Sequence, residues 1–257
     1  GKTTTTALLS LLFARKGFNV LAVDEDPQMN LPYALSIPDD KKNKIIPLNR
    51  NLDYIEEKTG ARPGTNWGIY LSLTPNVSDV VDRFCAKGPY GINVLVMGTV
   101  VQAATGCLCP ENALLDAVIK YINLRENEII LMDTQAGVEH FGRALSRGFK
   151  QIIIVTDFTF NSIQVAKHSF KLAKDIGIPY IHLVVNKIHS EKNIKRAKDL
   201  FGPILDEFTE IIYVPYEDSL LEYEPNVGPI LDKTPISPFV KKIEELQRIV
   251  EKYGLKL

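Results

Sequence analysis

Cysteine is scarce in this chain, which has three among its 257 residues. A small, odd number of cysteines does not fit the paired disulfide framework of secreted domains, so we expect a reducing, cytoplasmic setting. The chain also lacks any apolar stretch approaching the ~18 residues that a membrane span needs. These absences predict a protein that is neither held by disulfides nor embedded in a membrane.

An excess of charge of one sign is lacking as well. The 30 basic and 31 acidic residues leave a net charge of −1, and neither sign forms a long run. Charge therefore predicts no nucleic-acid partner and no anionic-membrane partner. With 45% apolar residues the chain can bury a sizeable core, and nothing marks a second domain, so we predict one domain over residues 1–257.

Short β-branched runs alternate with stretches at helical spacing. The runs are continuously apolar, which is typical of parallel strands covered by helices on both faces. The sequence therefore predicts an α/β fold with a doubly wound, mostly parallel sheet. The predicted strands are 19–24, 91–98, 127–134, 151–157, 180–188 and 210–215, and the predicted later helices are 110–125, 161–176, 191–205 and 237–253. Prolines interrupt residues 28–90, which we expect to cross the carboxyl edge of the sheet.

The first residues, GKTTTT, match the end of the phosphate-binding loop G-x-x-x-x-G-K-[ST]. A helix should follow such a loop, and apolar residues at helical spacing run from Ala7 to Leu12, with Gly17 placed to end the helix. The rival interpretation is a short secretory signal core. Arg15 and Lys16 stand where its small-residue cleavage site belongs, so the phosphate loop is favoured.

Polar residues follow three of the predicted strands. Asp24 and Asp26 follow the first, Asp133 ends the third, and Asn186 lies near the end of the fifth. Ligands of open parallel sheets bind outside the carboxyl ends of the strands. Any one of these residues is by itself more often a helix cap or turn residue. Their coincidence with the phosphate loop indicates a nucleotide site.

Together, GKTT, VDEDPQ, LMDTQAG and VVNK resemble the deviant-Walker superfamily of P-loop ATPases, which includes MinD, ParA and the nitrogenase iron protein. The loop of that superfamily reads K-G-G-x-G-K-T-T. The resemblance therefore implies that a strand and the residues K-G-G-x, with the signature lysine, precede Gly1. It also implies that Gly1 to Thr4 bind ATP: Lys2 and Thr3 contact phosphates and magnesium, and Thr4 lies near the inner phosphate.

The resemblance assigns roles to residues further along the chain. It implies that Asp26 orients the attacking water and that Asp133 holds the water shell of magnesium. Gly137 would sense the terminal phosphate. Asn186, with the backbone near Pro215, would hold adenine. Lys2, Asp26 and Asp133 are thus the expected catalytic residues, and ATP and magnesium the expected cofactors.

A C-x-C pair indicates one branch of this superfamily. Cys107 and Cys109 stand in MGTVVQAATGCLCPENALL, which is similar to the CooC-type nickel-insertion ATPases, as is DTQAGVEHFGR at 133–143. Two thiolates supply only half of a four-ligand nickel or zinc site, and a twofold homodimer would complete it. The alternative is that these cysteines are small apolar residues, as is usual for an isolated one such as Cys85. His140 is either an extra ligand or a residue that orients a loop.

The sequence thus predicts an ATPase that inserts nickel into a client, carbon monoxide dehydrogenase or acetyl-CoA synthase. A ParA- or MinD-like positioning ATPase acting on DNA or membrane is the alternative. It predicts a basic patch or an amphipathic C-terminal anchor, whereas the closing segment KKIEELQRIVEKYGLKL mixes both signs. A metal-binding module that is gated by nucleotide and does not turn it over is a third possibility.

Overall fold

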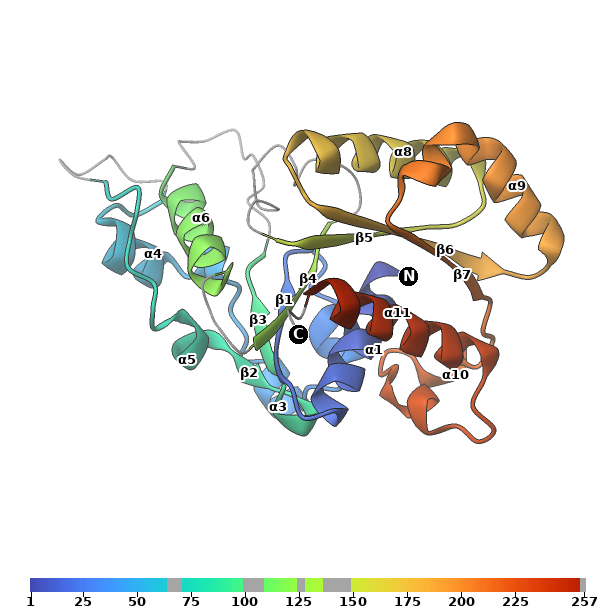
Figure 1. Ribbon diagram of the computed structural model, residues 1–257. Coiled ribbons are helices and arrows are strands. Elements are labelled where there is room, and N and C mark those ends of the chain that lie inside the picture. The colour runs from blue at the N-terminus through green and yellow to red at the C-terminus, as the bar shows by residue number, and fades with distance from the viewer. Residues whose placement is uncertain (64–70, 99–108, 124–127, 136–148, 255–257) are drawn as a thin grey trace. The chain divides into compact units, whose positions relative to one another are not determined.

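The computed structural model describes residues 1–63, 71–98, 109–123, 128–135 and 149–254 (Figure 1). Contacts divide the chain into two compact units. The first unit comprises Gly1–Leu12 and Ala136–Leu257, and the second comprises Phe13–Gln135. Helix α1 (Lys2–Arg15) begins in the first unit and ends in the second. The prediction of a single domain over the whole chain stays a prediction.

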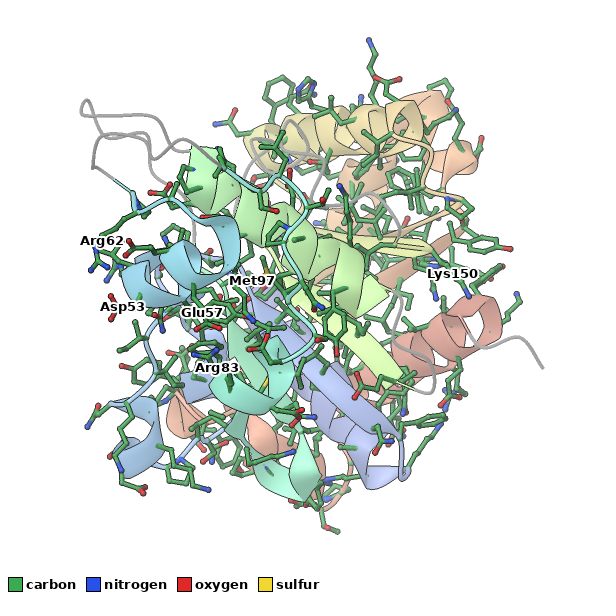
Figure 2. All side chains as sticks on the ribbon, turned by 90° about the vertical axis from the view of Figure 1, so that its left-hand side faces the viewer. Asp53, Glu57, Arg62, Arg83, Met97 and Lys150 are labelled. Atoms are coloured by element: carbon green, nitrogen blue, oxygen red, sulfur yellow. The ribbon has the colours of Figure 1, made fainter. Side chains whose placement is uncertain are left out.

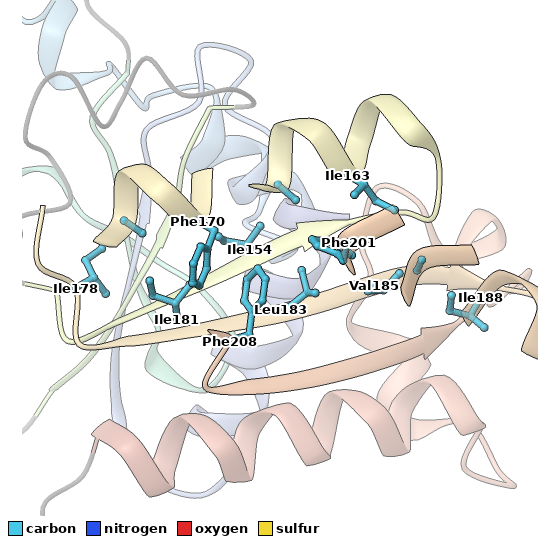
Figure 3. Close-up of a cluster of buried hydrophobic side chains, with 13 residues drawn as sticks. Ile154, Ile163, Phe170, Ile178, Ile181, Leu183, Val185, Ile188, Phe201 and Phe208 are labelled. Atoms are coloured by element: carbon cyan, nitrogen blue, oxygen red, sulfur yellow. The ribbon is translucent and has the colours of Figure 1, made fainter. Parts of the chain in front are cut away.

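The first unit contains a three-stranded parallel sheet in the order β5-β6-β7. Its strands are β5 (Gln151–Thr156), β6 (Tyr180–Ile188) and β7 (Glu210–Pro215), close to the predicted ranges. Helices α8 (Phe160–Asp175) and α9 (Glu191–Phe201) cover one face, and α11 (Pro238–Gly254) covers the other (Figure 3). The predicted helices at 161–176 and 237–253 are confirmed. The one predicted at 191–205 ends early, because a 3₁₀ helix, η3 (Gly202–Glu207), follows α9. The remaining short elements of this unit are α10 (Leu220–Tyr223) and η4 (Gly228–Asp232).

The core of the first unit lies between this sheet and helices α8 and α9 (Figure 3). Phe170, Phe201 and Phe208 form its aromatic centre, with ring centroids 4.4 Å apart for Phe170 and Phe208 and 5.8 Å for Phe201 and Phe208. Isoleucine and valine side chains of β5 and β6 complete it. Burial of this apolar surface fixes the sheet, and with it the carboxyl ends of the strands.

On the other face, the end of α11 is tied to the strands through the first residue of β5. The Gln151 side chain donates to the Val250 carbonyl at 3.0 Å, and its Oε1 lies 3.0 Å from Nε2 of His182. His182 is 1% exposed, and its ring centroid lies 5.2 Å from that of Tyr253. His182 is therefore a core residue.

The second unit contains a four-stranded sheet in the order β2-β3-β1-β4. Strands β1 (Asn19–Asp24), β3 (Asn93–Val96) and β4 (Glu128–Asp133) run parallel, and the short β2 (Ala86–Lys87) pairs antiparallel with β3. Helix α6 (Cys109–Asn123) follows β3 in the chain and packs against α4 (Leu52–Thr59). A mostly parallel α/β architecture is therefore confirmed.

The predicted excursion over residues 28–90 is more ordered than expected. It contains the short elements α2 (Leu31–Ala34), α3 (Asp39–Lys42), η1 (Leu48–Arg50), α4, α5 (Val80–Phe84), β2 and η2 (Pro89–Gly91). Helix α4 is capped at both ends. The Asn51 side chain accepts the Tyr54 N–H at 3.1 Å at the amino end, and Gly60 ends the helix in the left-handed conformation, with φ +78°. The sequence analysis predicted none of these short elements.

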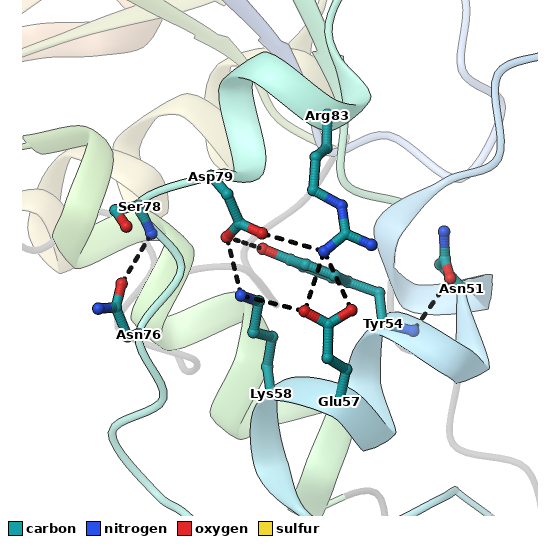
Figure 4. Close-up of polar contacts among 8 residues, drawn as sticks. All are labelled: Asn51, Tyr54, Glu57, Lys58, Asn76, Ser78, Asp79 and Arg83. Carbon is teal, nitrogen blue, oxygen red and sulfur yellow. Dashed lines mark hydrogen bonds and ion pairs between the residues drawn. The ribbon is translucent and has the colours of Figure 1, made fainter.

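A polar network joins α4 to α5 (Figure 4). Arg83 binds both oxygens of Glu57 at 2.9 and 3.0 Å, and also Asp79 at 3.0 Å. Lys58 lies 3.0 Å from Asp79, and the Tyr54 hydroxyl donates to the same carboxylate at 3.1 Å. Burial raises the pKa of Asp79, but hydrogen bonds from Lys58 and Arg83 outweigh this effect and lower the pKa to about 2. Asp53 and Arg62 form a further ion pair nearby (Figure 2).

Candidate functional site

The amino end of α1 has the features of an anion site. The carbonyl oxygen of Gly1 accepts both the N–H and the hydroxyl of Thr5, at 2.9 and 2.8 Å, which closes the first helical turn. The first N–H groups of a helix, here those of Lys2, Thr3 and Thr4, lack acceptors within the helix. They present partial positive charge at the helix end, which favours phosphate.

The first unit brings Gly1 and Asn186 together. A Cβ atom at Gly1 would collide with Nδ2 of Asn186, and it would lie 3.8 Å from a methyl group of Val155. A larger residue at this point would require the Asn186 amide to move. Two of the predicted nucleotide-binding residues, far apart in sequence, thus lie side by side at the carboxyl ends of β5 and β6. Nucleotide binding by these two residues stays a prediction.

Asn186 lies where the regular pairing of β6 and β7 is interrupted. The register shifts between Val185 and Ile188, and the Asn186 side chain accepts the N–H of Lys187 at 2.8 Å. Lys187 has φ +60°, a backbone conformation that few non-glycine residues adopt. Pro215 pairs with Ile188 across the two strands. The two residues predicted to hold adenine therefore come from the ends of adjacent strands.

An aromatic pair stands at the same ends of β6 and β7. The rings of His189 and Tyr216 stack with centroids 4.6 Å apart and an interplanar angle of 30°. The Tyr216 N–H donates to the Ile188 carbonyl at 2.9 Å, which fixes the backbone of this pair. Sequence reasoning gave His189 no role, because its aromatic neighbour is distant in sequence.

In the second unit, acidic residues gather at the carboxyl end of the sheet. Asp24 of β1 and Asp133 of β4 are paired directly across the two parallel strands. Asp24, Glu25 and Asp133 are 0%, 1% and 2% exposed. Buried carboxylates are costly unless hydrogen bonds or cations compensate them. Carboxylate oxygens are also ligands that Mg²⁺ prefers, so this donor chemistry fits magnesium.

Asp24 organises the loop that follows β1. Its Oδ1 accepts the Asp26 N–H and its Oδ2 accepts the Leu31 N–H, both at 3.0 Å. Burial raises the pKa of Asp24 to about 7; the Leu31 hydrogen bond opposes this shift, and the nearby Asp133 adds to it. Sequence reasoning noted Asp24 without giving it a role. The signal was the D-x-D spacing at the end of a buried strand.

Asp26 lies in that loop and is half-buried. Its side chain accepts the Gln28 N–H at 2.9 Å, and its carbonyl accepts the Met29 N–H at 3.0 Å. The carboxylate of Asp26 therefore borders solvent, whereas that of Asp133 is enclosed. This difference in exposure is compatible with a role for Asp26 at a water molecule and a role for Asp133 at a cation.

Several predicted site residues fall outside the described part of the chain. Gly137, His140 and Cys107 belong to undescribed segments, and Cys109 is described only as the first residue of α6. Cys85 is half-buried at the end of α5. Within the described ranges, no group of three or more His, Cys, Asp or Glu side chains is arranged to hold a metal ion. The metal site predicted at the C-x-C pair stays a prediction.

The chain is similar to known proteins over most of its length. Residues 1–224 match the profile of a family described as the CobQ/CobB/MinD/ParA nucleotide binding domain. The chain is 35% identical, over 100% of its length and 94% of the relative, to an uncharacterised ATP-binding protein of Methanocaldococcus jannaschii. It is 32% identical, over 86% of its length and 81% of the relative, to the carbon monoxide dehydrogenase accessory protein CooC of Rhodospirillum rubrum.

Solved structures share the fold at lower identity. The MinC:MinD cell division protein complex of Aquifex aeolicus contains a chain that matches with a TM-score of 0.68 and 20% identity, covering 100% of this chain and 93% of that one. The cell division ATPase MinD of Pyrococcus furiosus matches with a TM-score of 0.66 and 22% identity, covering 98% and 93%. None of the helices in the described ranges has the length and apolar character to cross a membrane.

Proposed function

Because the chain belongs to the CobQ/CobB/MinD/ParA nucleotide-binding family and is an ATPase, we propose that it uses ATP to insert nickel into carbon monoxide dehydrogenase or acetyl-CoA synthase. The observation that carries this proposal is the 32% identity to the accessory protein CooC over 86% of the chain. The C-x-C pair at Cys107 and Cys109 supports it. The proposal places the protein in the cytoplasm, as a homodimer without nucleic-acid or membrane partners.

In this proposal, Gly1, Lys2, Thr3 and Thr4 hold the phosphates of ATP. The Gly1 backbone and the end of α1 offer N–H donors, and Lys2 supplies a positive charge for the outer phosphates. The Thr3 hydroxyl, and Asp133 through the water shell, would hold magnesium, which when bound would neutralise charge on the phosphates. Each of these residues is assigned from the family motif.

The remaining site residues complete the nucleotide site in the same way. Asp26 orients the attacking water, Gly137 contacts the terminal phosphate, and Asn186 with the backbone near Pro215 holds adenine. Asp24 accepts the Asp26 N–H and so fixes the backbone from which that carboxylate extends. Catalysis then depends mainly on position and electrostatics, as in other phosphoryl-transfer sites.

The metal cargo binds between two copies of the chain in this proposal. Cys107 and Cys109 of each protomer give four thiolates, which suits nickel or zinc in a closed site. ATP binding would close the two protomers and hydrolysis would reopen them. Nucleotide state would thereby control access to the thiolates.

Client activation tests the proposal. Nickel-free carbon monoxide dehydrogenase is incubated with limiting nickel, MgATP and the full-length protein, and its activity is followed with time. The expected result is activation that requires ATP and is lost both in Asp26→Ala and in the Cys107→Ala/Cys109→Ala variant. Cys85→Ala is the matched control and should activate like the wild type. Equal activation without ATP, or by the double cysteine variant, would refute the proposal.

A further inference from the structure

Glu25 connects the carboxyl end of β1 with the carboxyl end of β4 in the second unit. It follows the last residue of β1 and is 1% exposed. Its backbone N–H donates to the carbonyl of Asp133 at 2.9 Å. Its side-chain Oε2 accepts the N–H of Gln135 at 3.4 Å. Both the backbone and the carboxylate of Glu25 therefore engage the chain where β4 ends.

The two neighbouring acids have different partners. Asp24 accepts backbone N–H groups of Asp26 and Leu31, which belong to its own loop. Glu25 accepts a backbone N–H from a residue 110 positions later in the chain. Asp24 thus shapes the loop after β1, and Glu25 joins that loop to the segment after β4. An enclosed carboxylate at this point is explained by hydrogen bonding, since apolar packing alone would favour an apolar residue.

We propose that Glu25 is a positioning residue that couples the end of β4 to Asp26. The inference rests on the proposed function, in which Asp26 orients the attacking water. Gln135 lies two residues beyond the end of β4, and Glu25 directly precedes Asp26 in the chain. The hydrogen bond from the Gln135 N–H to the Glu25 carboxylate therefore limits how far the backbone next to Asp26 can move. The position of the Gln135 backbone and the alignment of the water are then linked.

Two substitutions of similar size separate hydrogen bonding from packing. Glu25→Gln keeps the length of the side chain and an oxygen acceptor for the Gln135 N–H. Glu25→Met keeps the length but has no comparable acceptor. Both remove the charge, so a difference between them reports the hydrogen bond. Glu111→Met, at another buried glutamate of the second unit, is the matched control.

The first measurement is amide hydrogen exchange of Gln135 in the full-length protein without nucleotide. The Glu25→Met variant should exchange this proton up to about tenfold faster, the change expected when one ordinary hydrogen bond is lost, since the Gln135 N–H lies 3.4 Å from its acceptor. Glu25→Gln should stay within about threefold of the wild type, since a neutral acceptor retains roughly half of such a bond. Wild-type exchange in the Met variant would overturn the proposal.

The second measurement is steady-state hydrolysis of MgATP together with the Kd of a fluorescent ATP analogue. Glu25→Met should lower kcat by roughly 10- to 100-fold, the range expected for misplacement of a reacting group, with Kd changed less than about threefold. Glu25→Gln should keep kcat within about threefold. Equal losses of kcat in both variants, or a loss confined to Kd, would contradict coupling through the acceptor.

Folding and function are controlled separately. Circular dichroism checks each variant, and Glu25→Ala replaces the Met variant if the latter does not fold. Glu111→Met should leave Gln135 exchange and kcat within about twofold of the wild type, as substitutions away from specific features do. A wild-type protein without ATP hydrolysis would refute the proposed function, whereas the exchange result would still decide whether Glu25 holds Gln135.

Discussion

At the scale of residues, exposure separates the two aspartates assigned to catalysis. Asp133 is 2% exposed and paired with Asp24 across the sheet, whereas Asp26 is half-buried in a loop. An enclosed carboxylate can hold the water shell of a magnesium ion, and a carboxylate at the surface of a loop can meet a water molecule. Their substitutions should therefore fail at different steps.

We expect Asp26→Ala to lower kcat for ATP by about 100-fold or more, the usual contribution of a group that positions or deprotonates the nucleophile. ATP binding should persist. Asp133→Ala should instead weaken binding of ATP in the presence of magnesium and leave magnesium-free binding unchanged. Titration calorimetry with and without magnesium, combined with phosphate release, measures both effects. Hydrolysis at the wild-type rate by Asp26→Ala would refute its assignment.

His182 gives a prediction for stability against pH. Burial lowers the pKa of His182 to about 4, from 6.5 for the exposed side chain; Glu210 opposes this shift and Lys252 adds to it. The unfolded chain therefore takes up a proton that the folded chain does not between pH 6.5 and 4. The free energy of unfolding should fall as pH falls through this window, by at most about 3 kcal/mol from this residue.

Urea unfolding at several pH values checks this. His182→Gln removes the titrating group and should flatten the pH dependence between pH 6.5 and 4. His168→Gln, at an exposed position of α8, is the control and should keep the wild-type slope. An unchanged slope in His182→Gln would mean that another group causes the acid sensitivity.

At the scale of elements, periodicity predicted the long strands and helices well, because each is built from a continuous apolar run or a helical stripe. Most of the elements it missed lie in residues 28–90, where most helices have five residues or fewer, and two others, α10 and η4, are as short. Elements that short carry less than two helical turns of pattern and are stabilised by caps and tertiary contacts. The sequence alone offers little signal for such interactions.

The α4–α5 network illustrates such tertiary contacts. Tyr54 is 1% exposed, and its ring packs against Phe84 with centroids 4.6 Å apart. Tyr54→Phe keeps this packing and removes the hydroxyl that donates to Asp79. We expect it to lower the free energy of unfolding by about 0.5–1.5 kcal/mol, the range for a typical hydrogen bond, since Lys58 and Arg83 still bind the Asp79 carboxylate.

The matched control is Tyr33→Phe, since Tyr33 is 43% exposed and its ring, which Lys42 contacts, is retained. It should change the free energy of unfolding by less than about 0.5 kcal/mol. Chemical denaturation of the two variants gives the comparison. Equal stability of Tyr54→Phe and the wild type would show that the hydroxyl does not help to hold α5 on α4.

The candidate site shows the same division between what sequence does and does not predict. GKTT and the acids at strand ends were identified from the sequence because motif and strand position coincide. The approach of Gly1 to Asn186 and the contact of Glu25 with Gln135 were not predicted, because each joins residues more than 100 positions apart. Such pairs depend on strand order, which local patterns do not specify.

At the scale of the whole molecule, membership of the family establishes an ATPase, whereas metal delivery is our proposal and depends on the C-x-C pair. Related folds at 20–22% identity serve cell division, so fold alone does not select a function. Under the proposed function, the chemistry of Cys107 and Cys109 sets the role of this chain apart from those of the cell division proteins. Their coordination is therefore the central claim.

Equilibrium titration of the reduced, full-length protein with nickel and with zinc, combined with sedimentation, tests that claim most directly. Because four thiolates require two chains, metal should favour the dimer by linkage, with one ion bound per dimer. Binding should be lost in Cys107→Ala/Cys109→Ala and kept in Cys85→Ala, while ATP binding survives in both. One ion per monomer, or unchanged metal binding by the double variant, would contradict the account.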